Sequence, residues 1–315
     1  MRVGASIGIS LATPGTASTE LLFQHADTAM YQAKALGNGS FQFFEPAMCI
    51  AAKRRLQLEV ALHRALDQDQ FEVHYQPRVD LRSMRLLGVE ALLRWNHPEF
   101  GRVPPLEFIP LAEERGHIGA IGQWVLGVAC RDVKQLNDRL GLALHVSVNV
   151  SARQLRLPDL VAQVRQALGA SGLPPAALEL ELTESALIDD LEQSAEMLRG
   201  LKALGVRLSI DDFGTGYSSL SYLKRFPIDV LKLDRSFVAE NPAGDGFVRA
   251  LIDMAHVLDL SVVAEGIESG TAMEALRDAA CDEGQGYLFA RPMPLGELEA
   301  FVANETGKSE SRLTS

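Results

Sequence analysis

The 315-residue chain contains few cysteines, no block of basic residues and no long apolar run. Its three cysteines, Cys49, Cys130 and Cys281, lie far apart without CxxC spacing, which argues against a disulfide framework or a cysteine zinc site and is typical of a reducing compartment. No apolar run is long enough to span a bilayer, and the start has no signal-peptide pattern. We therefore expect a cytoplasmic chain without a membrane segment of its own, although a longer parent protein could be membrane-anchored.

Charge and glycine patterns exclude two further classes. The formal net charge is −11, and together with the lack of basic clusters it argues against a nucleic-acid polymer as a partner. A small anionic ligand stays compatible with this charge if bound cations offset the acidic field. No glycine-rich dinucleotide fingerprint follows the early predicted strands, which disfavours a Rossmann fold.

What the chain does contain is enough apolar material, 47% of its residues, for one barrel-sized domain and a smaller piece. Residues 1–45 predict a strand, a helix starting near Ser18 or Thr19, and a second strand, which is a partial α+β fragment that buries too little to stand alone. An apolar stripe predicts a helix over 47–69. We divide the rest into a helical linker over 46–57, a main domain over 58–303 and a polar, disordered tail over 304–315.

The main domain alternates between strand and helix patterns. Residues 71–81 and 86–95 predict two antiparallel neighbouring strands, and strands near 144–150, 178–183, 206–210, 228–233 and 261–265 follow with helices between them. Repeated units of this kind over ~250 residues favour a β/α barrel over an open sheet.

The stretch 206–234 is the most informative part of this domain. One predicted strand ends in Asp211 and Asp212, a loop FGTGYSS and a short helical run near 218–225 follow, and the next apolar strand carries Lys232. A lysine inside a strand buried on both faces requires an anionic partner, and the two aspartates are candidates. Taken alone, the same residues also fit a capped helix start and a lysine that extends its ammonium to solvent.

Polar side chains occur at or near the end of nearly every predicted strand of the domain, and in a barrel these ends converge on one face. A set of oxygen ligands without thiolates favours hard cations, which are Mg²⁺ or Mn²⁺, with Ca²⁺ as a further option. Two such ions close together suit the attack of water on a phosphodiester. Lys232 would then hold the water or offset phosphate charge. The residues are Glu90, Asn149, Glu181, Asp211, Asp212, Lys232, Glu265 and Gln285.

Three further charged residues have two interpretations each. Arg94 fits a phosphate clamp, or a rim arginine paired with Glu107 or Glu113. Glu184 and Glu268 each follow a candidate ligand by three residues, and they fit either anchors for the FGTGYSS loop or ordinary carboxylates in the first turn of a helix.

Seven motifs in order resemble the EAL domain, the bacterial phosphodiesterase of cyclic di-GMP, over roughly residues 52–303. They are EALLRW (90–95), NVSARQ (149–154), ELTES (181–185), DDFGTGYSS (211–219), KLD (232–234), AEGIE (264–268) and GQGYLF (284–289). The resemblance implies a modified TIM (β/α)8 barrel with one antiparallel strand. It also implies hydrolysis of cyclic di-GMP to linear pGpG with two Mg²⁺ or Mn²⁺, in a homodimer.

Residue roles follow from the same resemblance. It implies metal ligation by Glu90, Asn149, Glu181, Asp211, Asp212 and Glu265, and catalysis by Lys232, Glu265 and Glu90. It further implies substrate contacts from Gln76, Arg94 and Gln285, and anchoring of the 211–219 loop by Glu184 and Glu268. His74 and His117 depart from the usual pattern but lie outside these motifs. The alternatives are a receptor that binds cyclic di-GMP without cleaving it and a protein-interaction module.

Residues 1–45 resemble the final part of a diguanylate cyclase (GGDEF) domain, in SIGIS and HADTAMYQAKALGNG. The GG[DE]EF signature is absent, so the resemblance implies a remnant without cyclase activity. We expect a truncated or late-started version of a longer GGDEF–EAL protein.

Overall fold

The computed structural model describes residues 4–12, 18–35, 39–188, 190–214, 225–239 and 246–313. The chain divides into two compact units, one of Met1–Gln68 with Leu106–Ala112 and one of Asp69–Pro105 with Glu113–Ser315. Within the described residues, no helix is both long and apolar enough to cross a membrane.

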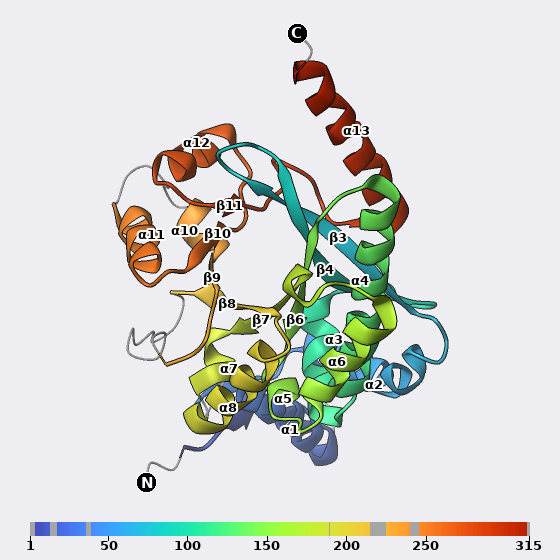
Figure 1. The fold of residues 1–315 in the computed structure, drawn as a ribbon. Helices are drawn as coiled ribbons and strands as arrows, with labels where there is room; N and C mark the ends of the chain where they lie inside the picture. The colour runs from blue at the N-terminus through green and yellow to red at the C-terminus, as the bar shows by residue number, and fades with distance from the viewer. Residues whose placement is uncertain are drawn as a thin grey trace. The chain divides into compact units, whose positions relative to one another are not determined.

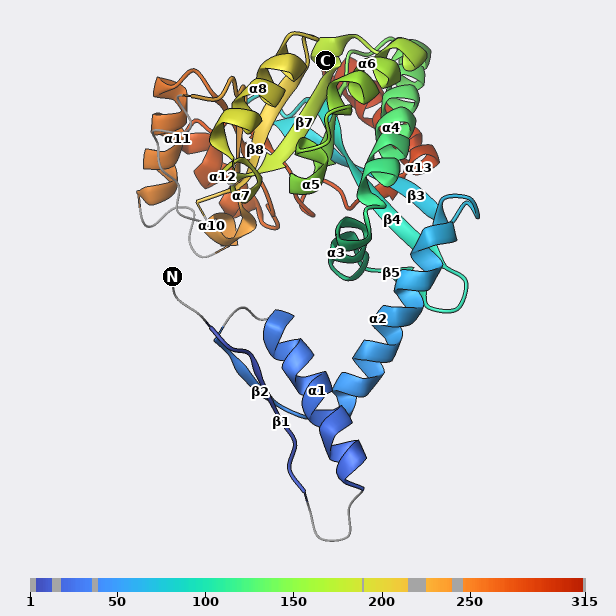
Figure 2. The same ribbon diagram turned by 90° about the horizontal axis from the view of Figure 1, so that it is seen from below.

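The first unit contains a parallel pair of strands, β1 (Ile7–Ile9) and β2 (Phe41–Phe43), connected by α1 (Thr19–Ala35). Figure 2 shows α1 lying along one side of the pair. Gly8 permits this approach, because a Cβ there would lie 1.9 Å from the Ala26 carbonyl oxygen. The predicted strand–helix–strand order of residues 1–45 is confirmed.

A single helix, α2 (Pro46–Ala65), follows in the same unit. The predicted limit between linker and main domain at residue 57 therefore lies inside a continuous helix. No proline or glycine interrupts the stretch after Pro46, and Leu58, Leu62 and Ala65 are buried on one side of it.

The second unit is built on a closed barrel of eight strands, counted over the described residues (Figure 1). All neighbouring pairs are parallel except the two that involve β3, which runs antiparallel to both β4 and β11. The predicted barrel with one antiparallel strand is confirmed. Around the ring the strands are β3 (Phe71–Asp80), β4 (Leu86–His97), β6 (His145–Val150), β7 (Leu178–Thr183), β8 (Arg207–Phe213), β9 (Val230–Leu233), β10 (Ser261–Ala264) and β11 (Glu283–Gly284).

Two short strands extend this sheet, β5 (Gly101–Val103) beside β4 and β12 (Met293–Pro294) beside β3. Helices surround the ring in Figure 1, as the alternating pattern predicts. They are α4 (Ile118–Leu140), α5 (Ala152–Leu155), α6 (Leu160–Ser171), η1 (Pro175–Ala177), α7 (Glu184–Ile188), α8 (Leu191–Lys202), α10 (Arg235–Ala239), α11 (Phe247–Val257), α12 (Gly270–Asp278) and α13 (Leu295–Leu313). One more helix, α3 (Pro105–Arg115), belongs mostly to the first unit.

The strands carry apolar residues toward the helices and several charged residues toward the barrel interior. In β7, Leu178, Leu180 and Leu182 alternate with Glu179 and Glu181, and all five side chains are buried. Because successive strand residues point to opposite faces, the two glutamates share the inner face. The inner face of β7 is therefore acidic, which is rare in a buried parallel strand.

The helical region predicted near 106–140 is two helices, because Gly116 adopts φ +78° and ends the first of them. The predicted disordered tail from residue 304 is wrong up to Leu313, since α13 continues to that residue. Glutamate, lysine and arginine favour helices, and a helix already anchored by the buried Leu298 and Val302 extends at low cost. The helical run predicted near 218–225 lies almost wholly outside the described residues.

Candidate active site

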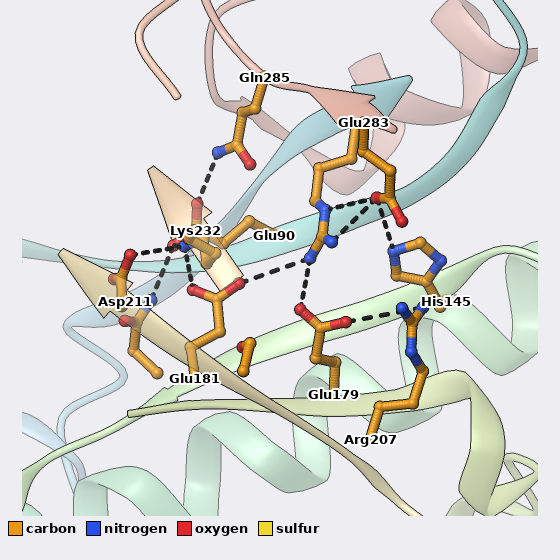
Figure 3. A network of polar contacts seen from close by, with 12 residues as sticks. Glu90, His145, Glu179, Glu181, Arg207, Asp211, Lys232, Glu283 and Gln285 are labelled. Atoms are coloured by element: carbon orange, nitrogen blue, oxygen red, sulfur yellow. Dashed lines mark hydrogen bonds and ion pairs between the residues drawn. The ribbon is translucent and has the colours of Figure 1, made fainter. Parts of the chain in front are cut away.

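The site is centred on Lys232 of β9, whose side chain is fully buried at the carboxyl ends of the parallel strands (Figure 3). Its Nζ lies 2.6 Å from Glu181 Oε2, 2.6 Å from Glu265 Oε1 and 3.2 Å from Asp211 Oδ1. These carboxylates come from β7, the residue after β10, and β8. One cation thus connects three neighbouring segments of the barrel.

The strand around Lys232 explains why the lysine is held in place. Val230, Leu231 and Leu233 are buried, so the backbone cannot shift the ammonium toward solvent without exposing apolar side chains. An unpaired buried ammonium costs several kcal/mol, and the surrounding carboxylates offset that cost. The predicted partner Asp211 is found, while Glu181 and Glu265 make the shorter contacts.

Glu90 is held on the other side of the cluster by two side-chain amides. Its Oε1 accepts a hydrogen bond from Asn149 Nδ2 at 2.7 Å, and its Oε2 accepts one from Gln285 Nε2 at 2.5 Å. Lys232 Nζ lies 4.0 Å from Glu90 Oε1. Asn149 and Gln285 thus hold both oxygens of Glu90.

Gln76, predicted to contact substrate, lies behind this amide. Its Oε1 accepts a hydrogen bond from Gln285 Nε2 at 2.9 Å, and its Nε2 donates to the carbonyl of Ala290 at 3.2 Å. Gln76 therefore orients Gln285 within the structure.

Asp211 and Asp212 sit at an irregularity in β8, where the pairing with β9 shifts between Ile210 and Phe213. Asp212 adopts φ +54°, a left-handed conformation that aspartate tolerates better than most residues. Its amide donates to Asp211 Oδ1 at 3.0 Å. A bulge of this kind redirects side chains, so consecutive carboxylates are both kept near the end of the barrel.

The electrostatics reflect one cation among several acids. Burial disfavours charge on Lys232, but Glu181, Glu265 and Glu90 outweigh it and raise the lysine pKa well above its usual value. Burial and the neighbouring Glu90 raise the pKa of Glu181, and burial together with Asp211 raises that of Asp212.

Two acids of the cluster differ in their protonation. Burial raises the pKa of Glu265 to about 7, with Lys232 opposing the shift. Burial also opposes ionisation of Glu90, but Lys232 and the amides of Gln285 and Asn149 outweigh it and lower the pKa of Glu90. Glu90 is therefore held as a carboxylate more firmly than Glu265, whose pKa lies near neutral pH.

The donor set fits a hard divalent cation. Every candidate ligand is a carboxylate or amide oxygen, which Mg²⁺ and Mn²⁺ prefer. Glu181 Oε1 is buried and accepts no hydrogen bond within the described part of the chain. Among the described residues no group of three Asp, Glu, His or Cys side chains is arranged to hold a metal ion as it stands, and the Lys232 ammonium lies between Glu181, Glu265 and Asp211.

The structure also describes the remaining predicted residues, Arg94, Glu184 and Glu268. Arg94 is half-buried, donates to the carbonyl of Leu93 at 3.0 Å, and its pKa is lowered by burial and by the nearby charge of Arg102. Glu107, one of its two suggested partners, pairs with Arg54 at 2.8 Å within the first unit. Glu184 begins α7 and Glu268 is exposed before α12, while residues 215–219 of the loop they were predicted to anchor lie outside the described residues.

Sequence reasoning missed a second group of buried charges, next to the first in Figure 3. Arg78 of β3 is fully buried and contacts Glu179, Glu181 and Glu283. The signal was present in HYQPRVDL, where an arginine stands inside a predicted strand, as Lys232 does in β9. Because polar residues also surround Arg78 in the sequence, its charge does not stand out there as the charge of Lys232 does among apolar residues.

These observations define a β/α barrel with a carboxylate-rich face at the carboxyl ends of its parallel strands. A family model described as the EAL domain matches residues 59–292, and the chain belongs to the EAL domain family. The resemblance inferred from the motifs is therefore confirmed, and the match begins one residue after the predicted start of the main domain at 58.

Relatives and a solved structure agree with this assignment. The chain is 45% identical over 301 residues to cyclic di-GMP phosphodiesterase NbdA of Pseudomonas aeruginosa, covering 95% of this chain and 38% of that protein. It is 42% identical over 297 residues to cyclic di-GMP phosphodiesterase PdeR of Escherichia coli, covering 93% of this chain and 45% of that protein. The chain thus spans less than half the length of these relatives. The structure of the PaMucR phosphodiesterase in complex with c-di-GMP superposes with a TM-score of 0.73 at 44% identity, covering 77% of this chain and 99% of that one.

Proposed function

We propose that this chain hydrolyses one phosphodiester bond of cyclic di-GMP and releases linear pGpG, lowering the level of a bacterial second messenger. The observation that carries the proposal is the buried Lys232 ammonium, held by Glu181, Glu265 and Asp211 at the barrel end where active sites form. Membership of the EAL domain family and the names of the relatives support the choice of substrate.

The acidic cluster needs positive charge before it can accept a phosphodiester, and we assign this to two Mg²⁺ or Mn²⁺. When bound, such ions supply charge stabilisation at the phosphate and lower the pKa of a coordinated water. The residues that would hold them are Glu90, Asn149, Glu181, Asp211, Asp212 and Glu265.

Lys232 and Glu265 handle the attacking water. The ammonium is a donor fixed by buried strands, so it orients a water oxygen with little loss of entropy. Glu265, whose Oε1 lies 2.6 Å from the Lys232 Nζ, accepts the proton of that water.

Substrate is held by Arg94, Gln285 and Gln76. Arg94 presents a planar guanidinium that fits a phosphate in two-point contact. The Oε1 atom of Gln285 is buried without a hydrogen-bond partner among the described residues, so it is a ready acceptor once a ligand group arrives. Gln76 acts through Gln285, which it already contacts.

The test is incubation of the protein with cyclic di-GMP and Mg²⁺, with pGpG followed by chromatography and mass detection. We expect complete conversion with multiple turnovers. Binding of cyclic di-GMP without formation of pGpG would identify a receptor. Absence of both binding and cleavage would identify a protein-interaction module. Either result would refute the proposal.

Four smaller assignments accompany the main one. Residues 1–45 correspond to the final part of a GGDEF domain and do not convert GTP to cyclic di-GMP by themselves, which a GTP incubation would check. Glu184 and Glu268 anchor the 211–219 loop. The chain forms a homodimer, testable by light scattering. It acts in the cytoplasm, which the free state of all three cysteines supports.

A further inference from the structure

The second group of buried charges, next to the candidate active site, is centred on Arg78, whose side chain has no exposure to solvent. Its Nη1 donates to Glu179 Oε1 at 2.7 Å, and its Nε donates to Glu283 Oε2 at 3.1 Å. The third carboxylate is Glu181, with Oε1 3.6 Å from Arg78 Nη1. These acids come from β7 and β11, so Arg78 connects parts of the barrel on both sides of β3.

Two of these acids already compensate the arginine. Burial opposes the ionisation of Glu179, but Arg78 and Arg207 outweigh it and hold its pKa at about 2. Arg207 lies 3.6 Å from Glu179, and His145 lies 3.7 Å from Glu283. The short bonds to Glu179 and Glu283 therefore account for the stability of the buried arginine, whereas the longer contact to Glu181 is not required for it.

Among the described residues, Glu181 is the one carboxylate that contacts both Lys232 and Arg78. Its Oε2 contacts Lys232 at 2.6 Å, and its Oε1 faces Arg78 on the opposite side. In Figure 3, Lys232, Asp211 and Glu90 lie on one side of Glu181, and Glu179, His145 and Glu283 lie on the other. The two cations bracket the carboxylate and favour one rotation of its plane.

We propose that Arg78 is a positioning residue that holds Glu181 in the rotation needed to ligate a divalent cation. This inference rests on the proposed metal-dependent function. A ligand must be held to within about 0.5 Å, and loss of a residue that orients a ligand typically weakens metal affinity about 10- to 100-fold. Arg78 has no exposed surface at which a substrate could bind, so its action passes through Glu181.

The experiment measures Mn²⁺ binding by electron paramagnetic resonance of the free ion, at constant pH, for the wild-type chain and two variants. Arg78→Lys keeps the charge but loses the planar fork. The double variant Arg78→Met/Glu179→Gln removes one buried cation and one buried anion together, which limits the folding penalty. We expect both variants to bind Mn²⁺ about 10-fold or more weakly than the wild type.

Arg207→Met is the matched control, because Arg207 pairs with Glu179 on the side away from Glu181. We expect Arg207→Met to lower the unfolding temperature but to leave the Mn²⁺ dissociation constant unchanged within about 2-fold. The Arg78 variants, in contrast, should regain turnover of cyclic di-GMP at high Mn²⁺ concentration.

The outcomes separate the two proposals. A wild-type chain that binds no Mn²⁺ would refute the metal-dependent function itself. Normal Mn²⁺ affinity in both folded Arg78 variants would overturn the positioning role alone. Failure of both to fold, judged by circular dichroism, would make Arg78 a purely structural residue and would also overturn it. If Arg207→Met lost as much Mn²⁺ affinity as the Arg78 variants, the positioning role of Arg78 would also be overturned.

Discussion

Lys232 Nζ and Glu265 Oε1 lie 2.6 Å apart, in a barrel where the lysine is fully buried and the glutamate is the residue that follows β10. Each stabilises the charge of the other, and burial keeps the pKa of Glu265 at about 7. The pair therefore places a fixed hydrogen-bond donor beside a carboxylate that can accept a proton.

Replacing Lys232 should remove catalysis more than binding. We expect Lys232→Met to lower kcat about 10³-fold, because a positioned donor contributes on the order of 10²–10⁴ to the rate. Cyclic di-GMP binding should persist, as measured by calorimetry. Lys202→Met is the control, since Lys202 pairs with Asp229 at 2.8 Å outside the cluster and should retain turnover. Wild-type kcat in Lys232→Met would remove the lysine from the mechanism.

Gln76 should act through the amide it holds. Gln76→Leu leaves Gln285 Nε2 with Glu90 as its partner but without the second acceptor. We expect kcat/KM to fall about 10-fold, consistent with the loss of a hydrogen bond to a buried polar group. The control is Gln123→Leu, an exposed glutamine that donates to Gln166 at 3.3 Å. Equal kinetics in the two variants would show that Gln76 has no role in the site.

Divalent cations should control both activity and stability. Excess EDTA should abolish pGpG formation, because the carboxylates of the cluster have too little counter-charge in Lys232 to accept a phosphodiester. Added Mg²⁺ or Mn²⁺ should restore activity and raise the unfolding temperature, because a ligand that binds only the folded state stabilises it. Calorimetry and thermal unfolding measure both effects. Undiminished turnover in EDTA would refute the metal assignment.

His145 should make the barrel sensitive to acid. Burial and the charge of Arg78 lower its pKa to about 3, against about 6.5 in the unfolded chain. Between these values the unfolded state binds the extra proton, so stability falls as the pH drops through this window. The loss attributable to His145 between pH 7.5 and pH 5.0 is about 2 kcal/mol.

The variant His145→Gln should lose correspondingly less stability over the same pH range. Urea unfolding at the two pH values, with the Mg²⁺ concentration held constant, measures the difference between the variant and the wild type. An identical pH dependence in both proteins would show that His145 does not cause the acid sensitivity.

The sequence predicted much of the barrel and of the cluster around Lys232. Particular residues explain why this was possible. Lys232 stands out because its neighbours are apolar, and a charge in such a strand demands partners. Adjacency along the chain suggested Asp211 and Asp212 as those partners. The nearest carboxylates come from other parts of the chain. Glu181 lies on β7, two strands away from β9, and Glu265 follows β10, the neighbour of β9, so the arrangement of the barrel strands brings them to the lysine.

Two other features were not predicted, each for a different physical reason. Arg78 lies in a strand with polar neighbours, so its burial depends on the carboxylates of β7 and β11, which are distant in sequence. The tail predicted to be disordered from residue 304 is helical up to Leu313, because a polar composition excludes a packed core but not a helix. Long-range pairing determines the first feature, and local propensity the second.

The most direct test of the central claim is turnover of cyclic di-GMP in ¹⁸O-labelled water with Mg²⁺, followed by mass spectrometry of the product. Attack of a water held by Lys232 on one phosphorus forms a P–O bond and breaks the P–O3′ bond, leaving a 3′-hydroxyl. We predict pGpG with a single ¹⁸O atom in its terminal phosphate, formed over many turnovers. Absence of pGpG from protein that binds cyclic di-GMP, or pGpG without the label, would contradict the account.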